Sequence, residues 1–140
     1  MKNTKFNRVA CIILLIMVLV LEILPYGAVV AYGNPTDSGQ IERINTYFSY
    51  FSITPFGRGN FAPLATAILS CILTTTTLLA IMKNTKKGFY CAKVLAGVTT
   101  VVSIFPILFF VYSLIGLFIS LALLLEWILL TKQYKVFTAQ

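Results

Sequence analysis

One acidic residue stands inside an otherwise apolar stretch of the sequence. Glu22 is the single charged residue of the run 9–31. If that run starts at a membrane face, Glu22 lies about 20 Å along the helix, well inside hydrocarbon. An ionisable group at that depth is a functional-site candidate by default, and desolvation favours its uncharged form. Such a carboxyl can carry protons, or it can fix helix packing by hydrogen bonds, and both interpretations stay open.

A second stretch, 61–82, has no charge and carries hydroxyl groups at helical spacing. These groups belong to Thr66, Ser70, Thr74 and Thr77. Residues three and four apart share one face of a helix. Hydroxyls in lipid bond to their own helix or across to a neighbour, so we expect this face to look into a bundle and to meet Glu22. The carboxyl and the four hydroxyls form the candidate intramembrane site.

The other charged candidates lie closer to the ends of the apolar runs. Glu126 stands beside Trp127 and within two turns of Lys132, which favours a carboxylate that snorkels to the interface and pairs with this lysine. Arg43 and Arg58 are candidates for contacts with lipid headgroups or an anionic ligand on the outer side. A solvent- or lipid-facing role without a specific ligand is the simpler interpretation of both arginines.

The residue types that catalysis and metal binding most often need are scarce. The chain has no histidine, and its three cysteines form no CxxC pair. An intramembrane enzyme needs a nucleophile and a base within reach of each other, and no such arrangement is visible. We therefore expect no enzyme activity, no metal and no other cofactor.

Composition places the chain in a membrane. Of its 140 residues, 59% are apolar and only 11% are charged, against about 25% charged in soluble domains. The apolar runs predict one all-α membrane domain, 1–140, built as a bundle of four transmembrane helices. The predicted spans are 9–31, 61–82, 92–111 and 114–131.

The spans need two qualifications. Residues 94–125 carry no charge, and one helix over 94–130 would be about 55 Å long, so the run must turn back into two spans. The basic start, apolar middle and small residues at 27–31 also resemble a cleaved signal peptide. The length of the first run and Glu22 within it favour a membrane span instead.

Basic residues decide the orientation. Nine of the 11 lysines and arginines lie before the first span, in the connection 83–91 and the start of the third span, or in the tail. The positive-inside bias then puts both termini and the connection 83–91 in the cytoplasm, as expected for a multi-pass plasma-membrane protein. The same placement argues against nucleic-acid binding, and leaves the lipid bilayer, a second copy or another membrane protein as partners.

The outer loop, 32–60, is predicted to contain a short interfacial helix. Asp37 could cap it, with Gln40 as the reciprocal partner. The apolar face would be Ile41, Ile44, Phe48 and Phe51, which recur at helical spacing. We expect this face to rest on the bundle or on lipid headgroups.

Two segments of the sequence resemble those of a known group of membrane proteins. The stretches Glu22-Ile-Leu-Pro-Tyr-Gly27 and Tyr50-Phe-Ser-Ile-Thr-Pro-Phe-Gly57, with Asn60-Phe61 after it, resemble a family of small uncharacterised four-span membrane proteins of low-GC Gram-positive bacteria. The resemblance implies the topology and a bacterial plasma membrane, but no activity. The chain is also similar to small multidrug transporters, which have four spans and a glutamate in the first helix. It departs from them in its long outer segment and lysine-rich connection.

Two functions follow as hypotheses. The leading one is a non-enzymatic membrane protein that acts as a structural, accessory or interaction component. The alternative is a small oligomeric transporter coupled to protons, with Glu22 as the proton carrier.

The orientation can be tested by thiol labelling. With Cys11 and Cys71 replaced, an impermeant maleimide added to intact cells should leave Cys91 unlabelled, because the connection 83–91 is predicted to be cytoplasmic. Permeabilised cells provide the positive control. Labelling of Cys91 from outside would reverse the predicted topology.

Overall fold

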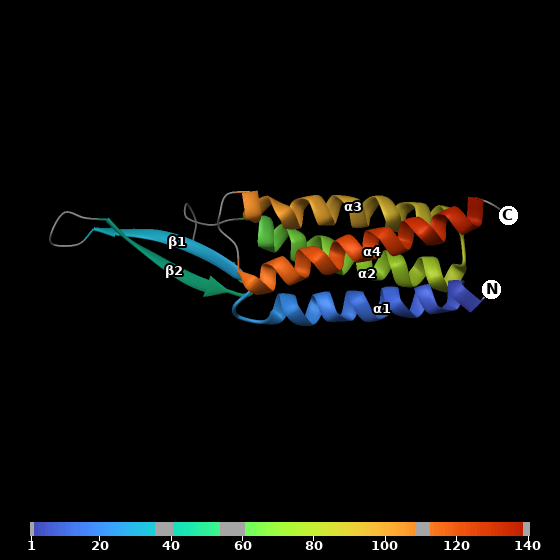
Figure 1. Cartoon of the computed structure of the whole chain (residues 1–140), viewed down its shortest axis with the longest axis horizontal. Helices are drawn as coiled ribbons and strands as arrows, with labels where there is room; N and C mark the ends of the chain where they lie inside the picture. The colour runs from blue at the N-terminus through green and yellow to red at the C-terminus, as the bar shows by residue number, and fades with distance from the viewer. Residues whose placement is uncertain (1, 36–40, 54–60, 109–112, 139–140) are drawn as a thin grey trace.

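The chain folds into a helical bundle with a β-hairpin at one end. The computed structural model describes residues 2–35, 41–53, 61–108 and 113–138. Its elements are α1 (Lys2–Ile23), β1 (Ala28–Pro35), β2 (Ile41–Phe48), α2 (Phe61–Lys83), α3 (Lys86–Leu108) and α4 (Leu114–Thr138). The hairpin projects beyond one end of the bundle, here called the hairpin end, and both chain termini lie at the other, the terminal end (Figure 1).

All four helices are long and apolar enough to cross a membrane. They contain 22 to 25 residues, which corresponds to about 33–38 Å of helix against a hydrocarbon layer about 30 Å thick. The prediction of a mostly helical four-helix bundle is confirmed, and the length and apolarity of the helices indicate a multi-pass membrane protein.

Large apolar side chains lie both on the surface of the bundle and in its core. Ile13 and Val101 are exposed at 60% and 70% of their surface, which suits contact with lipid, whereas Leu73 and Phe89 are fully buried. Small and polar side chains also pack in the interior. The buried set includes Ala67, Ala80, Ala92, Ala96, Thr66, Thr99, Ser103 and Ser120. Close helix approach therefore depends on small residues at the helix interfaces.

The helices form a ring in which α1 packs against α2 and α4, and α3 packs against the same two helices. The connection between α2 and α3 is only two residues long. Asn84 takes a left-handed conformation with φ of 49°, which suits a residue that ends a helix. Thr85 then caps α3 through its Oγ, which accepts from the Gly88 amide at 3.3 Å. The predicted loop 83–91 is therefore mostly helix.

The predicted interfacial helix in the outer loop is wrong. Ile41–Phe48 is a strand, paired antiparallel with Ala28–Pro35 from Ala28 opposite Phe48 to Pro35 opposite Ile41. The four residues of the predicted apolar face do not act together, because Phe48 packs against the core whereas Ile41 is 78% exposed. Asp37 and Gln40, the expected capping pair, lie outside the described residues.

The strand forms because a complementary segment precedes it. Val29 and Val30 in β1 and Ile44, Thr46 and Tyr47 in β2 are β-branched or aromatic, which suits extended backbone. Pairing also satisfies backbone groups that an isolated helical turn would leave open at its ends. Helical spacing within one short segment cannot reveal a partner that lies in another segment.

The span boundaries need corresponding corrections. The first helix ends at Ile23 and not at residue 31, because Pro25 disfavours helix at the residue before it and the chain then turns into β1. The third helix begins at Lys86, and the fourth continues to Thr138. The start of the fourth span at residue 114 agrees with the structure, while the predicted end of the third, residue 111, lies outside the described residues.

Candidate functional site

The Glu22 carboxyl is sealed inside the bundle and bonded to α2. Its side chain has no exposed surface. The Ser70 Oγ lies 2.6 Å from Glu22 Oε1 and 2.8 Å from Oε2. The same hydroxyl lies 2.8 Å from the Thr66 carbonyl oxygen, one turn earlier in α2. The expected contact between Glu22 and a hydroxyl of the second span is therefore present.

This geometry suits an uncharged carboxyl. A serine hydroxyl carries one proton and accepts through its lone pairs. A protonated Glu22 can donate to Ser70 Oγ, and Ser70 can then donate to the Thr66 carbonyl, so every proton in the chain has an acceptor. An ionised Glu22 would compete with that carbonyl for the single hydroxyl proton and would stay otherwise uncompensated, at high cost in hydrocarbon.

The backbone of Glu22 also holds the foot of the hairpin. Because Glu22 lies in the last turn of α1, its carbonyl has no partner within the helix. The Tyr50 amide and the Ser49 hydroxyl both donate to this oxygen at 3.0 Å. Glu22 thus joins α1 to α2 through its side chain and to the segment after β2 through its backbone.

Tyr50 fills the space where the hairpin meets the helices. Its side chain is buried, and two glycines make room for it. A Cβ at Gly27 would lie 2.8 Å from the Tyr50 ring, and one at Gly116 would lie 3.0 Å from the Tyr50 hydroxyl. Burial raises the pKa of this phenol, so Tyr50 is neutral. The hydroxyl of Ser113, the residue before α4, donates to the Gly27 carbonyl and so connects this end of α4 to the hairpin.

The four hydroxyls of the predicted α2 face make different contacts. Thr66 and Thr74 donate to carbonyls one turn back in α2, at 2.8 Å and 2.7 Å. The Thr77 hydroxyl is buried and has no partner in the described part of the chain. Among the four, Ser70 alone has a hydrogen bond to Glu22 in the described contacts. We call Glu22, Ser70, Ser49 and Tyr50 the hairpin-end cluster.

A second buried carboxyl lies nearer the terminal end. Glu126 in α4 has no exposed surface, so the predicted snorkelling toward Lys132 is wrong. Six residues of helix turn Lys132 about 120° away from Glu126, whereas Gln133, seven residues on, returns to the same face. Gln133 is buried with Glu126, and Lys132 is exposed.

The Glu126 carboxyl has few hydrogen-bonding groups around it in the described part of the chain. The Cys11 thiol lies beside the carboxyl, but neither Glu126 oxygen has a hydrogen-bond partner of normal geometry among the described residues. Gln133 Nε2 donates to Cys11 Sγ at 3.6 Å, and Gln133 Oε1 is likewise unpartnered in the described part. We call Cys11, Glu126 and Gln133 the terminal-end cluster. Cys11 and Glu22 are about 16 Å apart along α1, so the two clusters lie at different depths.

Sequence reasoning missed the burial of Glu126 because its neighbours are uniformly apolar. With no polar residue between 121 and 125, hydropathy alone does not distinguish one face of α4 from another. The available signal was the seven-residue step from Glu126 to Gln133, which puts two polar side chains on one stripe. Leu123 and Leu130, which are also buried, continue this stripe.

The remaining predicted site residues stay untested. Arg43 lies in β2 opposite Gly33, but its side chain is outside the described part, as is the whole of Arg58. An anion site at these arginines remains a prediction. Within residues 2–35, 41–53, 61–108 and 113–138, no three His, Cys, Asp or Glu side chains come together as a metal site would require.

No protein-family model, curated protein or solved structure matches the chain.

The bond between Glu22 and Ser70 can be tested by a double-mutant cycle. We expect Glu22→Gln to leave stability nearly unchanged, since its amide keeps a donor for Ser70 Oγ and the side-chain shape. Glu22→Leu and Ser70→Ala should each cost about 1 kcal/mol, the usual range for a polar contact between membrane helices. The Glu22→Leu/Ser70→Ala double variant should cost less than the sum, because one contact is lost only once.

Reversible unfolding in detergent and SDS, followed by Trp127 fluorescence and circular dichroism, gives these free energies. Thr75→Ala is the matched control, because this hydroxyl is exposed and bonds within α2. Strict additivity of the two single substitutions would show that the side chains of Glu22 and Ser70 are not coupled.

Proposed function

We propose that this chain is a non-enzymatic membrane protein that presents its β-hairpin to a protein partner outside the bilayer. The observation that carries the proposal is a hairpin fixed at its foot and open beyond it. Ala28, Val29 and Val30 are buried, whereas Ile41, Ile44 and Tyr47 are exposed. The hairpin projects past the helices on the side opposite both termini (Figure 1).

The foot of the hairpin is anchored from three helices. Glu22 in α1 accepts from Ser49 and Tyr50, and Ser70 in α2 holds the Glu22 side chain. Ser113, which caps α4, donates to the Gly27 carbonyl. These contacts support a fixed base from which the distal strands extend, as an interaction module requires.

The distal part of the hairpin has the features of a surface that pairs with another chain. A two-stranded ribbon is marginally stable alone in water. Each strand of this ribbon has one partner in the described sheet, so its outer edge can accept a further extended segment. We propose that the partner is a protein that adds such a segment and covers the exposed Ile41 and Tyr47, which share one face of β2, while Ile44 lies on the other face.

The orientation of the chain in the membrane is part of the same proposal. Nine of the 11 basic residues flank the ends of helices at the terminal end, which supports cytoplasmic termini in a bacterial plasma membrane. The hairpin then lies on the outer side. An interaction partner would be another envelope or membrane protein with an accessible segment at that surface.

Site-specific photo-cross-linking in the native cell tests the proposal. A photoreactive residue at Ile41 or at Tyr47 should give one discrete adduct, with the same partner protein from both positions. Met82, 79% exposed against 78% for Ile41, is the matched control on α2 and should not give that adduct. Adducts with lipid alone, with a second copy of the chain, or with unrelated proteins at the two positions would contradict the proposal.

The second candidate function is proton-coupled transport by an oligomer, and Glu126 is the observation that favours it. Two buried carboxyls at different depths, one with unpartnered oxygens, are a feature of proton pathways through membranes. The buried Thr77 hydroxyl lies between their levels along α2, about 10 Å from Ser70. A path would run from Glu22 through this region to Glu126.

Proton uptake into reconstituted vesicles separates the two functions. The transport alternative predicts uptake driven by a pH gradient that falls at least tenfold in both Glu22→Gln and Glu126→Gln while the bundle remains folded. Vesicles without protein set the background, and Ser120→Ala provides a buried polar control away from both carboxyls. If vesicles with the wild-type protein take up protons no faster than vesicles without protein, the protein does not transport protons in the absence of another substrate.

A further inference from the structure

A lipid-facing groove runs between α3 and α4 and ends among lysines. The groove has a volume of about 600 Å³, and its lining is apolar apart from Lys93 and Thr100. Val94, Val98 and Val101 form its wall on α3, and Trp127 forms its wall on α4. In a membrane this surface meets acyl chains.

Gly97 lets the Trp127 indole pack closely against α3 at the wall of the groove. The Trp127 indole lies across this glycine, with Nε1 3.2 Å from the position that a Cβ would take. A larger side chain at position 97 would push the indole away. The ring is 41% exposed, so one side packs on α3 and the other faces the lipid. Indole rings favour the level of the membrane where acyl chains meet headgroups.

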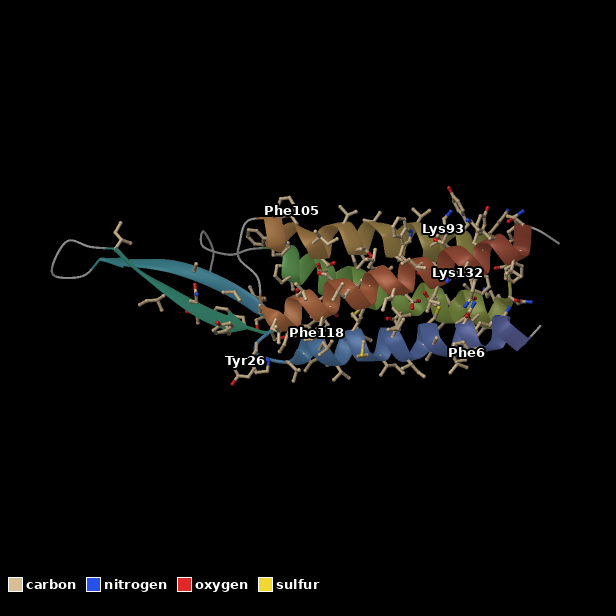
Figure 2. All side chains as sticks on the ribbon, viewed as in Figure 1. Phe6, Tyr26, Lys93, Phe105, Phe118 and Lys132 are labelled. Atoms are coloured by element: carbon tan, nitrogen blue, oxygen red, sulfur yellow. The ribbon has the colours of Figure 1, made fainter. Side chains whose placement is uncertain are left out.

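Lys93 stands where the apolar groove meets the terminal end of the bundle. Its Nζ lies 4.6 Å from the centre of the Tyr134 ring on α4 and 5.2 Å from the centre of the Tyr90 ring on α3. Contact with two aromatic faces holds the ammonium between the helices. Both Lys93 and Lys132 are found toward the terminal end of the bundle (Figure 2).

Two further hollows lie toward the same end of the bundle and contain lysines. One, of about 270 Å³, is lined by Trp127, Ile128, Thr131, Lys132 and Lys135. The other, of about 450 Å³, is lined by Lys86, Lys87, Tyr90, Cys91 and Tyr134. The first hollow shares Trp127 with the groove, and the second shares the two tyrosines that contact Lys93. Together with Lys93, the two hollows bring five lysines from two helices to this end of the bundle.

The protein supplies no acidic side chain to neutralise these lysines. The sequence contains four acidic residues. Glu22 and Glu42 belong to the hairpin end, and Asp37 lies between the two strands in the sequence. Glu126 is sealed in the core. Within the described residues no acidic side chain lies among the five lysines, so an anionic group from outside the chain would complement their charge.

We propose that this surface binds an anionic diacyl phospholipid, with an acyl chain in the groove between α3 and α4 and the phosphate held by Lys93 and its neighbouring lysines. A lipid of this class matches both parts of the site at once. The apolar groove accommodates the chain, and the basic hollows at its end complement the headgroup charge, as in basic pockets that bind acidic lipids between membrane helices. Neutral lipids can fill the groove but cannot balance the lysines.

Native mass spectrometry of the detergent-purified protein, titrated with lipids of identical chains, tests the site. Phosphatidylglycerol should be retained at least fivefold more than phosphatidylcholine by the wild type. Lys93→Gln should weaken retention of phosphatidylglycerol about fivefold, the effect of one lysine near an anionic surface. Lys83→Gln is the matched control, since this lysine is exposed at the same end of the bundle but lines none of the three hollows.

The groove and the headgroup contacts can be separated. Val101→Trp fills the groove from its lipid side, where Val101 is 70% exposed, and should reduce retention of both lipids without unfolding the bundle. Glycerol phosphate, which has the headgroup charge and no chains, should not compete with the lipid at equal concentration. Equal retention of the two lipids, an equal loss in Lys83→Gln, competition by glycerol phosphate, or a dimer whose formation excludes lipid would each overturn the proposal.

Discussion

Hydrocarbon offers no hydrogen-bond partner, and this constraint shapes the whole molecule. Each polar group within the bundle has to find its partner in the chain itself or bear the cost of having none. Most hydroxyls on the helices meet the requirement locally. Thr66, Thr74, Thr99 and Thr100 all donate to the carbonyl one turn earlier in their own helix. The bundle can therefore bury a polar interior without a large network between helices.

The two buried glutamates show how the same residue type can be satisfied to different extents. The Glu22 carboxyl lies beside the Ser70 hydroxyl, which can donate to the Thr66 backbone carbonyl. The backbone carbonyl of Glu22 accepts from the Tyr50 amide, just after β2. The hydrogen bonds of Glu22 join α1, α2 and the segment after β2. Glu126 has a thiol and an amide near it but no donor of normal geometry among the described residues. The greater cost of Glu126 makes it the stronger candidate for a role beyond packing.

The bundle is fastened at both ends by contacts between distant parts of the chain. At the hairpin end, Ser113 reaches the Gly27 carbonyl. At the terminal end, Arg8 donates to the Asn84 side chain at 2.6 Å, and its guanidinium lies 5.7 Å from the centre of the Phe89 ring. These ends also differ in chemistry. One carries a projecting ribbon with exposed apolar side chains, and the other carries lysines.

The sequence by itself determined the four spans and the face of α2 that looks inward, because helix length, hydropathy and three-to-four spacing are local properties. It also singled out Glu22, since a charge in an apolar run is visible without a structure. Three features needed the tertiary structure. Ile41–Phe48 is a strand because Ala28–Pro35 lies beside it, Glu126 is buried because α1 covers its face of α4, and Lys93 meets Tyr134 because α3 packs on α4. Each depends on a partner from another segment, and spacing within one segment contains no record of that partner.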